Sequence, residues 1–236
     1  MIFSTHRDKL QVKSNPFQED IGIKILIADD HAIIREGLKS LLEKKGIMDI
    51  EIAKNGREAI ELAIAHHPDV VIMDISMPNL NGMDATATIR KALPNTKIIA
   101  LSMHSSKQSI DKMFASGASG YILKESAVDE LYQAIQEVNN GNFYLTPSIG
   151  RMYLNGKGPL FKDMDDFPKS RKISKKEREV LQLVAEGQKT RDIAETLSVS
   201  IKTIESHRRN IMKKLNIFTI AGLTKFAIKE GMVSLE

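Results

Sequence analysis

Short apolar runs alternate with amphipathic stretches from Ile23 to Val138. The stretches between the runs carry apolar residues at helical spacing, as in Ile34, Leu38 and Leu41. Runs that are apolar along nearly their whole length are typical of parallel strands covered by helices on both faces. The pattern therefore predicts an α/β fold for this part of the chain, a doubly wound parallel sheet of five strands. The predicted strands are Ile23–Ala28, Asp49–Ala53, Val70–Met73, Ile98–Leu101 and Gly120–Leu123.

The periodicity stops after this segment. Residues 147–172 contain several glycines and prolines and the acidic residues Asp163, Asp165 and Asp166, a composition that predicts an interdomain linker. Residues 1–20 also show little periodicity and are interpreted as an N-terminal extension. The sequence thus predicts an extension (1–20), an α/β domain (21–146), a linker (147–172) and a second domain (173–236).

The pattern of the second domain predicts helices along its whole length. Ser174 with Glu177 three residues later is the signature of a capping box at a helix start. Thr190 is expected to cap a short second helix, and Ser200 a longer third one after a brief turn. A last helix is predicted near Thr219–Lys229. Two helices joined by a three-residue turn, the second of them basic, match the helix-turn-helix motif.

The two domains differ in charge. Residues 169–236 contain 15 Lys and Arg against 8 Asp and Glu, a net charge of +7, whereas residues 1–168 carry −3 of the total of +4. A small basic module joined to a larger, near-neutral domain suggests binding to nucleic acid. A lysine-rich solvated surface would give the same count, so charge alone leaves both interpretations open.

Composition narrows the cellular setting. The chain has no cysteine, which excludes disulfides, thiolate zinc sites and thiol nucleophiles. No apolar run approaches the roughly 18 residues of a membrane span, and the N-terminus has no secretory h-region. We therefore expect a cytoplasmic protein that does not associate with membranes.

Polar residues end the predicted strands at a single edge of the sheet. Asp29 and Asp30 follow the first strand, Asp74 the third, Ser102 the fourth and Lys124 the fifth. The carboxyl ends of parallel strands meet where such sheets bind ligands. Three carboxylates repel one another without a cation, and oxygen ligands of this kind suit Mg²⁺. With a hydroxyl and an ammonium at the same edge, the set predicts a phosphoryl-transfer site in which Asp74 is the nucleophile.

Each of these residues alone has a simpler interpretation. An Asp at a strand end commonly caps a helix, and a Lys is commonly solvated. His31, beside the acidic pair, is expected to face solvent or cap the first helix rather than to bind metal. The constellation is more specific than its members, because all five polar residues end buried strands at one edge.

The sequence resembles a known family in both domains. ILIADDHAIIREGL, VVIMDISMPNLNGMDA, IIALSMH and GASGYILK resemble the signature segments of bacterial response-regulator receiver domains. ISKKEREVLQLVAEGQKTRDIAETLSVSIKTIESHRRNIMKKLNI resembles the LuxR-type helix-turn-helix. The combination is similar to the NarL/FixJ type of two-component transcription factor. The resemblance implies a flavodoxin-like receiver with strand order 2-1-3-4-5, followed by an all-α DNA-binding domain.

The resemblance implies roles for the acidic edge. Asp74 matches the phosphoacceptor, Asp30 a direct Mg²⁺ ligand and Asp29 a nearby one. The backbone carbonyl of Ser76 matches the protein's remaining contribution to the coordination, together with Asp74 itself.

The resemblance also implies a switch. Ser102 matches the switch hydroxyl, Tyr121 the aromatic rotamer switch, and Lys124 the phosphate-contacting lysine. Phosphorylation of Asp74 adds a dianionic group, to which Ser102 can move. We expect this movement to open space into which Tyr121 turns.

The predicted recognition helix, from about Ile201, has a polar and partly basic face opposite an apolar one. Such a face on the second helix of a helix-turn-helix belongs in the DNA major groove. By resemblance, Glu205, Ser206 and Arg209 face bases, and Lys202, Thr203 and Lys213 contact phosphates.

The expected function is that of a DNA-binding transcriptional response regulator, phosphorylated on Asp74 by a partner histidine kinase and not an enzyme in its own right. The active form is expected to be a homodimer, formed through the last helix, with Ile220, Leu223 and Phe226, or through the receiver. Two alternatives stay open. One is a phosphatase of the haloacid-dehalogenase type, although those enzymes carry Asp-x-Asp on the first strand. The other is a signalling adaptor whose second domain binds protein.

Overall fold

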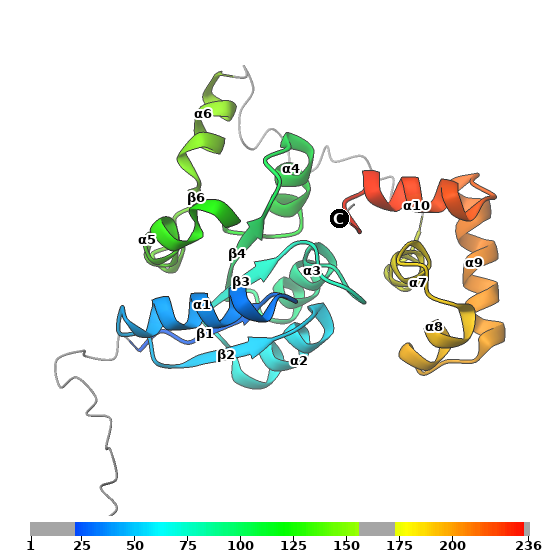
Figure 1. The fold of residues 1–236 in the computed structure, drawn as a ribbon, viewed down its shortest axis with the longest axis horizontal. Helices are drawn as coiled ribbons and strands as arrows, with labels where there is room; N and C mark the ends of the chain where they lie inside the picture. Colours follow the sequence, from blue (N-terminus) through cyan, green and yellow to red (C-terminus); the bar gives the residue numbers. More distant parts are fainter. Residues whose placement is uncertain (1–21, 156–172, 234–236) are drawn as a thin grey trace, which may run out of the picture.

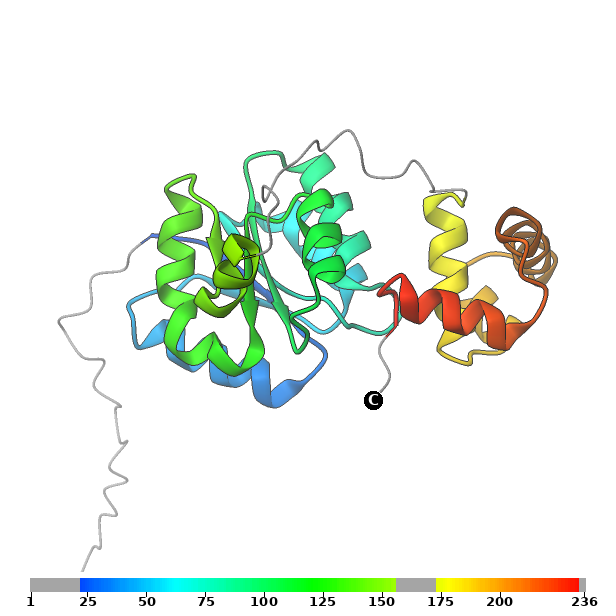
Figure 2. The same cartoon turned by 90° about the horizontal axis from the view of Figure 1, so that it is seen from above.

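The computed structural model describes residues 22–155 and 173–233 of the 236-residue chain. These ranges form an α/β domain and a smaller helical domain, which lie side by side (Figures 1 and 2). The predicted N-terminal extension (1–20) and most of the predicted linker lie outside the described residues.

The sheet of the first domain has the predicted topology and one additional strand. All neighbouring strands are parallel, in the order β2-β1-β3-β4-β5-β6. The prediction of five strands was one short, because β6 is only two residues long and lacks an apolar run of its own. The strands are β1 (Ile25–Ala28), β2 (Ile50–Ala53), β3 (Val70–Asp74), β4 (Lys97–Ser102), β5 (Gly120–Leu123) and β6 (Tyr144–Leu145).

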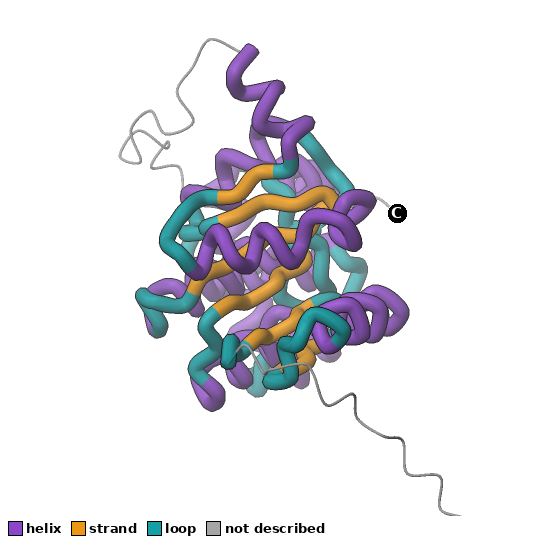
Figure 3. The backbone as a smooth tube through the Cα atoms, turned by 90° about the vertical axis from the view of Figure 1, so that its left-hand side faces the viewer, coloured by secondary structure: helices purple, strands orange, loops and turns teal. Residues whose placement is uncertain are grey.

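Helices cover both faces of this sheet (Figure 3). The apolar side chains of α1 (Ala32–Glu43) and α5 (Ala127–Asn139) form one core with β1, β3, β4 and β5. Those of α2 (Gly56–His66), α3 (Gly82–Ala92) and α4 (Lys107–Ala115) form a second core on the opposite face. The central strands β1 and β3 are apolar along nearly their whole length because both of their faces are buried under helices.

The segment after β6 differs from the prediction. Residues 147–172 are predicted to be linker, but their first part forms a helix, α6 (Pro147–Asn155). Ile149 of this helix is 1% exposed and joins the core beside α2, α3 and α4. One turn of apolar contact was too short to register as periodicity in the sequence.

The second domain consists of α7 (Lys175–Ala185), α8 (Thr190–Thr196), α9 (Ile201–Leu215) and α10 (Ile220–Lys229). The capping box of Ser174 and Glu177 is confirmed, as is the cap of α9 by Ser200. The predicted cap at Thr190 was wrong, because Lys189 is the N-cap of α8. The Thr190 hydroxyl instead accepts a hydrogen bond from Arg208 at 2.6 Å, which ties α8 to α9.

An ion pair between the exposed Lys214 and the buried Glu177 holds the start of α7 to the end of α9. Lys214 Nζ lies 2.8 and 2.7 Å from the two carboxylate oxygens of Glu177, which is 3% exposed. The backbone N–H of Ser174 donates to the same carboxylate at 2.6 Å. Burial raises the pKa of Glu177, but the hydrogen bonds from Lys214 and Ser174 outweigh it and hold the pKa below its ordinary value of 4.5.

We expect Glu177→Gln to lower the free energy of unfolding of this domain by about 1–2 kcal/mol at pH 7, because the amide keeps the shape but loses charged hydrogen bonds. A carboxylate with a lowered pKa stabilises the fold above its unfolded pKa and loses this contribution as the pH falls through the folded value. The difference between wild type and variant, measured by urea unfolding, should therefore shrink below about pH 4.5. An equal difference at pH 7 and pH 3 would contradict this assignment.

Among the described residues, no helix is both long enough and apolar enough to cross a bilayer.

Candidate functional site

The sheet brings the predicted acidic residues together at its carboxyl edge. Ala28 of β1 pairs with Met73 of β3, so Asp29 and Asp74 are neighbours. One ligand atom from each of Asp29, Asp30, His31 and Asp74 lies within 4.8 Å of the others. Asp29 and Asp74 are 0% and 2% exposed, because the neighbouring strands and loops surround them.

Lys124 lies between the two buried acids. It begins the 3₁₀ turn η1 (Lys124–Ser126) directly after β5. Its Nζ is 2.8 Å from Asp29 Oδ2 and 2.9 Å from Asp74 Oδ2. A single ammonium therefore bridges two carboxylates that come from different strands.

These charges shift one another's pKa. Burial raises the pKa of Asp74 above 3.8, the negative charge of Asp29 adds to the rise, and Lys124 opposes it. Burial lowers the pKa of Lys124, but attraction to Asp74 and Asp29 outweighs burial and raises it above 10.5. The Lys124 ammonium is therefore charged at neutral pH.

The donor set fits a hard divalent cation. Asp29 Oδ2, Asp30 Oδ1 and Asp74 Oδ2 are buried, and no described residue gives them a hydrogen bond of regular geometry. Their described partners are the ammonium of Lys124 and the Nδ1 atom of His31. Carboxylate oxygens held this close, with one ammonium against three acids, match the ligand preference of Mg²⁺. The fourth predicted ligand residue, Ser76, donates its backbone N–H to Asp74 Oδ1 at 3.3 Å.

His31 is closer to the acids than the sequence suggested. Its Nδ1 is 2.9 Å from Asp30 Oδ1 and 3.2 Å from Asp29 Oδ1, although the side chain is 57% exposed. It occupies the N-cap position of α1 without making a side-chain cap. The His31 ring therefore contacts the acidic cluster while more than half of the side chain faces solvent.

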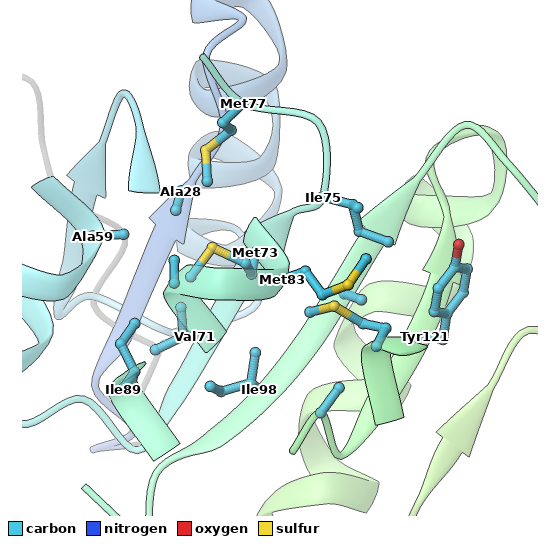
Figure 4. Close-up of a cluster of buried hydrophobic side chains, with 14 of the residues drawn as sticks. Ala28, Ala59, Val71, Met73, Ile75, Met77, Met83, Ile89, Ile98 and Tyr121 are labelled. Carbon is cyan, nitrogen blue, oxygen red and sulfur yellow. The ribbon is translucent and has the colours of Figure 1, made fainter. Parts of the chain in front are cut away.

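Ser102 and Tyr121 meet at the loop after β4. The backbone N–H of His104 donates to Ser102 Oγ at 3.0 Å, and the Tyr121 hydroxyl donates to the carbonyl of His104 at 2.7 Å. Burial raises the pKa of Tyr121 to about 12, and its ring is 0% exposed (Figure 4). The Tyr121 ring is buried in this arrangement, and its predicted turn after movement of Ser102 stays a prediction.

One buried residue of the site was missed in the sequence. Arg35 of α1 is 8% exposed, and its Nη1 donates to the backbone carbonyl of Asp29 at 2.7 Å. Arg35, Leu38 and Leu42 are the buried residues of α1. The sequence signal for this residue was the position of Arg35 on the apolar face of the helix. A buried guanidinium needs a hydrogen-bond acceptor inside the protein.

The predicted DNA-contacting residues share an open surface of α9. Five of the six are exposed, namely Lys202, Glu205, Ser206, Arg209 and Lys213. Thr203 is half-buried, and its hydroxyl lies 2.8 Å from the hydroxyl of the N-cap Ser200. Ile204 and Ile211 point into the domain core. In Figure 1, α9 lies on the side of the helical domain away from the sheet, so the first domain does not cover it.

The two domains contact each other through α7 and the loop after β3. Gln182 Nε2 donates to the carbonyl of Met77 at 3.0 Å, and Gln182 Oε1 accepts from the backbone N–H of Asn81 at 2.9 Å. Arg178 Nε donates to Asp84 Oδ1 at 3.0 Å. Nothing in the sequence pattern predicted this contact.

Further ion pairs lie on either side of this contact. Arg57 pairs with Glu179 of α7, and Lys112 Nζ of α4 lies 3.2 Å from Glu230 Oε2, directly after α10. In the first domain, the interface therefore extends from α2 to α4.

Comparison with known proteins identifies both domains. Residues 25–136 match the family model of the response regulator receiver domain, and residues 171–227 match that of bacterial regulatory proteins of the luxR family. The chain is 37% identical to the oxygen regulatory protein NreC of Staphylococcus carnosus, over 89% of this chain and 99% of NreC. It is 35% identical to the transcriptional regulatory protein MctR of Rhizobium johnstonii, over 90% of this chain and 96% of MctR.

Solved structures agree with these matches. The RcsB response regulator of Salmonella typhimurium is 27% identical, with a TM-score of 0.53 over 86% of this chain and 98% of that chain. An RcsB–DNA complex is 26% identical, with a TM-score of 0.53 over 88% of this chain and 98% of that chain.

Proposed function

The chain belongs to the NarL/FixJ family of two-component response regulators, DNA-binding transcription factors with a receiver and a LuxR-type domain, and we propose that phosphorylation of Asp74 controls its DNA binding. The phosphodonor is a partner histidine kinase, and the reaction requires Mg²⁺. The observation that carries the proposal is the buried contact of Lys124 with both Asp29 and Asp74 beside Asp30. We place the receiver at 21–146 and the DNA-binding domain at 173–236.

Asp74 is the nucleophile of the proposed transfer. A carboxylate oxygen of Asp74 attacks the phosphorus of a phosphohistidine, the P–N bond breaks, and the imidazole of the kinase leaves with the bonding electrons. Asp29, Asp30, Asp74 and the Ser76 carbonyl would hold Mg²⁺, which neutralises charge on the phosphoryl oxygens when bound. Because the chain phosphorylates itself and no second substrate, it is not classed as an enzyme.

Lys124 and Ser102 take the remaining phosphoryl oxygens. The Lys124 ammonium is already 2.9 Å from Asp74, so it contacts the new group without a large displacement. Ser102 reaches it by giving up its hydrogen bond from the His104 backbone. The Tyr121 hydroxyl is hydrogen-bonded to the carbonyl of His104. Movement of Ser102 therefore changes the loop at His104, which holds the Tyr121 ring.

The DNA contact follows from the open face of α9. Glu205, Ser206 and Arg209 face the bases, whereas Lys202 and Lys213 contact phosphates. Thr203 faces the phosphates of the DNA backbone. Its hydroxyl also contacts that of Ser200, the N-cap of α9, and so stabilises the start of the helix. Because DNA is the target, we place the protein in the cytoplasm.

The active form is a homodimer, but the last helix contributes less apolar surface than the sequence suggested. Ile220 is 53% exposed, whereas Leu223 is 1% exposed and Phe226 packs against the domain core. Phe218, 66% exposed in the turn before α10, joins Ile220 as the available apolar surface. We propose that this corner pairs two DNA-binding domains on adjacent half-sites.

The proposal is tested by selecting duplexes from a random pool with and without beryllofluoride and Mg²⁺, which imitate the phosphoryl group on an aspartate. We expect enrichment of a paired motif that strengthens with the mimic. Equal enrichment in both conditions would retain DNA binding and reject control by Asp74. Absence of any enrichment would favour the adaptor alternative.

Two substitutions on α9 separate its proposed roles. Lys202→Ala is expected to weaken binding to all duplexes alike and to reduce the salt slope by about 1, because one phosphate contact is lost. Arg209→Ala is expected to cost about 1–3 kcal/mol on the selected motif and to relax specificity at one position. Fluorescence anisotropy over a salt series measures both, with Lys91→Ala in the receiver as the charge-matched control. The same specificity profile for Arg209→Ala and wild type would contradict a base contact.

A further inference from the structure

The loop from Asp74 to α3 is completed by the other domain. It spans residues 75–81, and Asn81 caps α3 by accepting from the backbone N–H of Asp84 at 2.9 Å. Within the described residues, three backbone groups of this loop form hydrogen bonds with residues on or next to α7. The Asn79 N–H donates to Glu186 at 3.1 Å, the Asn81 N–H to Gln182 at 2.9 Å, and the Met77 carbonyl accepts from Gln182 at 3.0 Å.

Gln182 is the centre of this contact. It is 1% exposed, and both ends of its amide are used across the domain interface. Its Oε1 also accepts from Asn81 Nδ2 at 2.9 Å, while Nε2 donates to Glu186 at 2.8 Å as well as to Met77. A buried amide with all of these partners holds the loop in one conformation, because breaking the contact would leave several buried polar groups without hydrogen bonds.

The loop that Gln182 holds is part of the cation site. The Ser76 carbonyl belongs to the peptide group between Ser76 and Met77, and the Met77 carbonyl belongs to the next one. The two groups share the backbone angles of Met77. These angles are restricted further because Pro78 follows. The Met77 side chain is 2% exposed and belongs to the same core cluster as Ala28 and Met73 (Figure 4), so packing holds Met77 from the other side.

We propose that Gln182, in the DNA-binding domain, is a positioning residue for the receiver's cation site. It orders the loop after β3 so that the Ser76 carbonyl is already in place when the cation binds. A pre-ordered ligand loses less conformational freedom on coordination and binds more tightly. This inference rests on the proposed function, because it assigns the loop the cation-binding role stated there.

The coupling is reciprocal. If docking of α7 favours the cation, binding of the cation favours docking by the same factor. The recognition face of α9 stays open in this arrangement, so the contact links the DNA-binding domain to receiver chemistry without blocking DNA. The amides of Asn79 and Asn81 report on docking directly, because their acceptors lie in the other domain.

The test uses the full chain and nitrogen-15 NMR on wild type and Gln182→Leu, which keeps the volume but removes the hydrogen bonds. Gln133→Leu, an exposed position of α5, is the matched control. We expect hydrogen exchange at Asn79 and Asn81 to accelerate at least tenfold in Gln182→Leu without Mg²⁺. In a Mg²⁺ titration followed at Asp29, Asp30 and Asp74, the half-saturating concentration should rise by about tenfold, as for other residues that orient metal ligands. Glu186→Ala, which removes the acceptor of the Asn79 N–H and one acceptor of the Gln182 amide, should act in the same direction.

The outcomes separate the two proposals. If wild type shows no Mg²⁺-dependent change at the acidic residues, the cation site fails and the inference fails with it. If wild type binds Mg²⁺ and Gln182→Leu binds it equally well, only the positioning role is overturned. Tighter binding by the variant would also overturn it, since α7 would then restrain the loop. Retained duplex binding by Gln182→Leu shows that its second domain is folded.

Discussion

Asp74→Asn is expected to reduce phosphorylation by acetyl phosphate to background and to remove the effect of beryllofluoride on DNA binding. An amide cannot form the acyl phosphate, and its neutral side chain weakens the attraction for Mg²⁺. The amide has nearly the same shape as the carboxylate. The substitution removes a buried carboxyl group whose pKa is raised by burial and by the charge of Asp29. Lys124 keeps Asp29 as its partner at 2.8 Å. We therefore expect the receiver to stay folded while its chemistry is lost.

Intact-mass spectrometry after incubation with acetyl phosphate and Mg²⁺ measures the first effect, and anisotropy with a selected duplex measures the second. Asp129→Asn, in the first turn of α5, removes an exposed acid that is not part of the cluster and should behave as wild type. A variant that is still phosphorylated would show that another carboxylate is the acceptor. A phosphorylated wild type whose DNA binding does not change would reject the switch but not the acceptor.

Gly82→Ala is expected to destabilise the receiver by about 3 kcal/mol, at the upper end of overpacking, and to impair phosphorylation of Asp74. Gly82 is the first residue of α3, and its N–H donates to the Ile75 carbonyl at 2.9 Å. A Cβ at this position would overlap the backbone carbonyl of Asp74 and press on the Met73 side chain. The backbone oxygen cannot rotate away as a side chain could, so the strand end that carries Asp74 must shift.

Gly37→Ala is the matched control for this substitution. Gly37 is an exposed residue of α1, and a Cβ there would meet no atom within 4 Å. Alanine should stabilise this helix by up to about 1 kcal/mol, because it restricts the unfolded chain and favours helix. Urea unfolding and acetyl-phosphate labelling of both variants decide the question. Equal stabilities for Gly82→Ala and Gly37→Ala would show that the strand end accommodates the added methyl group.

Much of the site was predictable because it lies at the ends of strands. A parallel doubly wound sheet brings the carboxyl ends of all its strands to one edge, so Asp29, Asp74 and Lys124 had to lie at the same edge once the strands were placed. The recognition helix was predictable for a similar reason, since a helical period separates an apolar face from a polar one. Both arguments need only local patterns.

Other features depended on exact positions that local patterns do not contain. The contact of Lys124 with both Asp29 and Asp74, and the burial of the Tyr121 ring, depend on side-chain packing from several strands. Leu223 was a candidate for the dimer surface, but α10 turns it into the core of its own domain. The sequence shows that these residues are apolar or charged, and it does not show what each one contacts.

The sequence by itself determined the family, the α/β and helical domains and the acidic edge, because periodicity and strand-end chemistry are written within short stretches of chain. Only the tertiary structure decided how the domains meet. Gln182 and Asn81 are 101 residues apart, and no periodicity relates positions on two separate domains. Their contact arises because α7 leaves a polar face outside its own core and the loop after β3 leaves backbone groups unpaired. Such a match depends on the shapes of two folded surfaces, which exist only after each domain has folded.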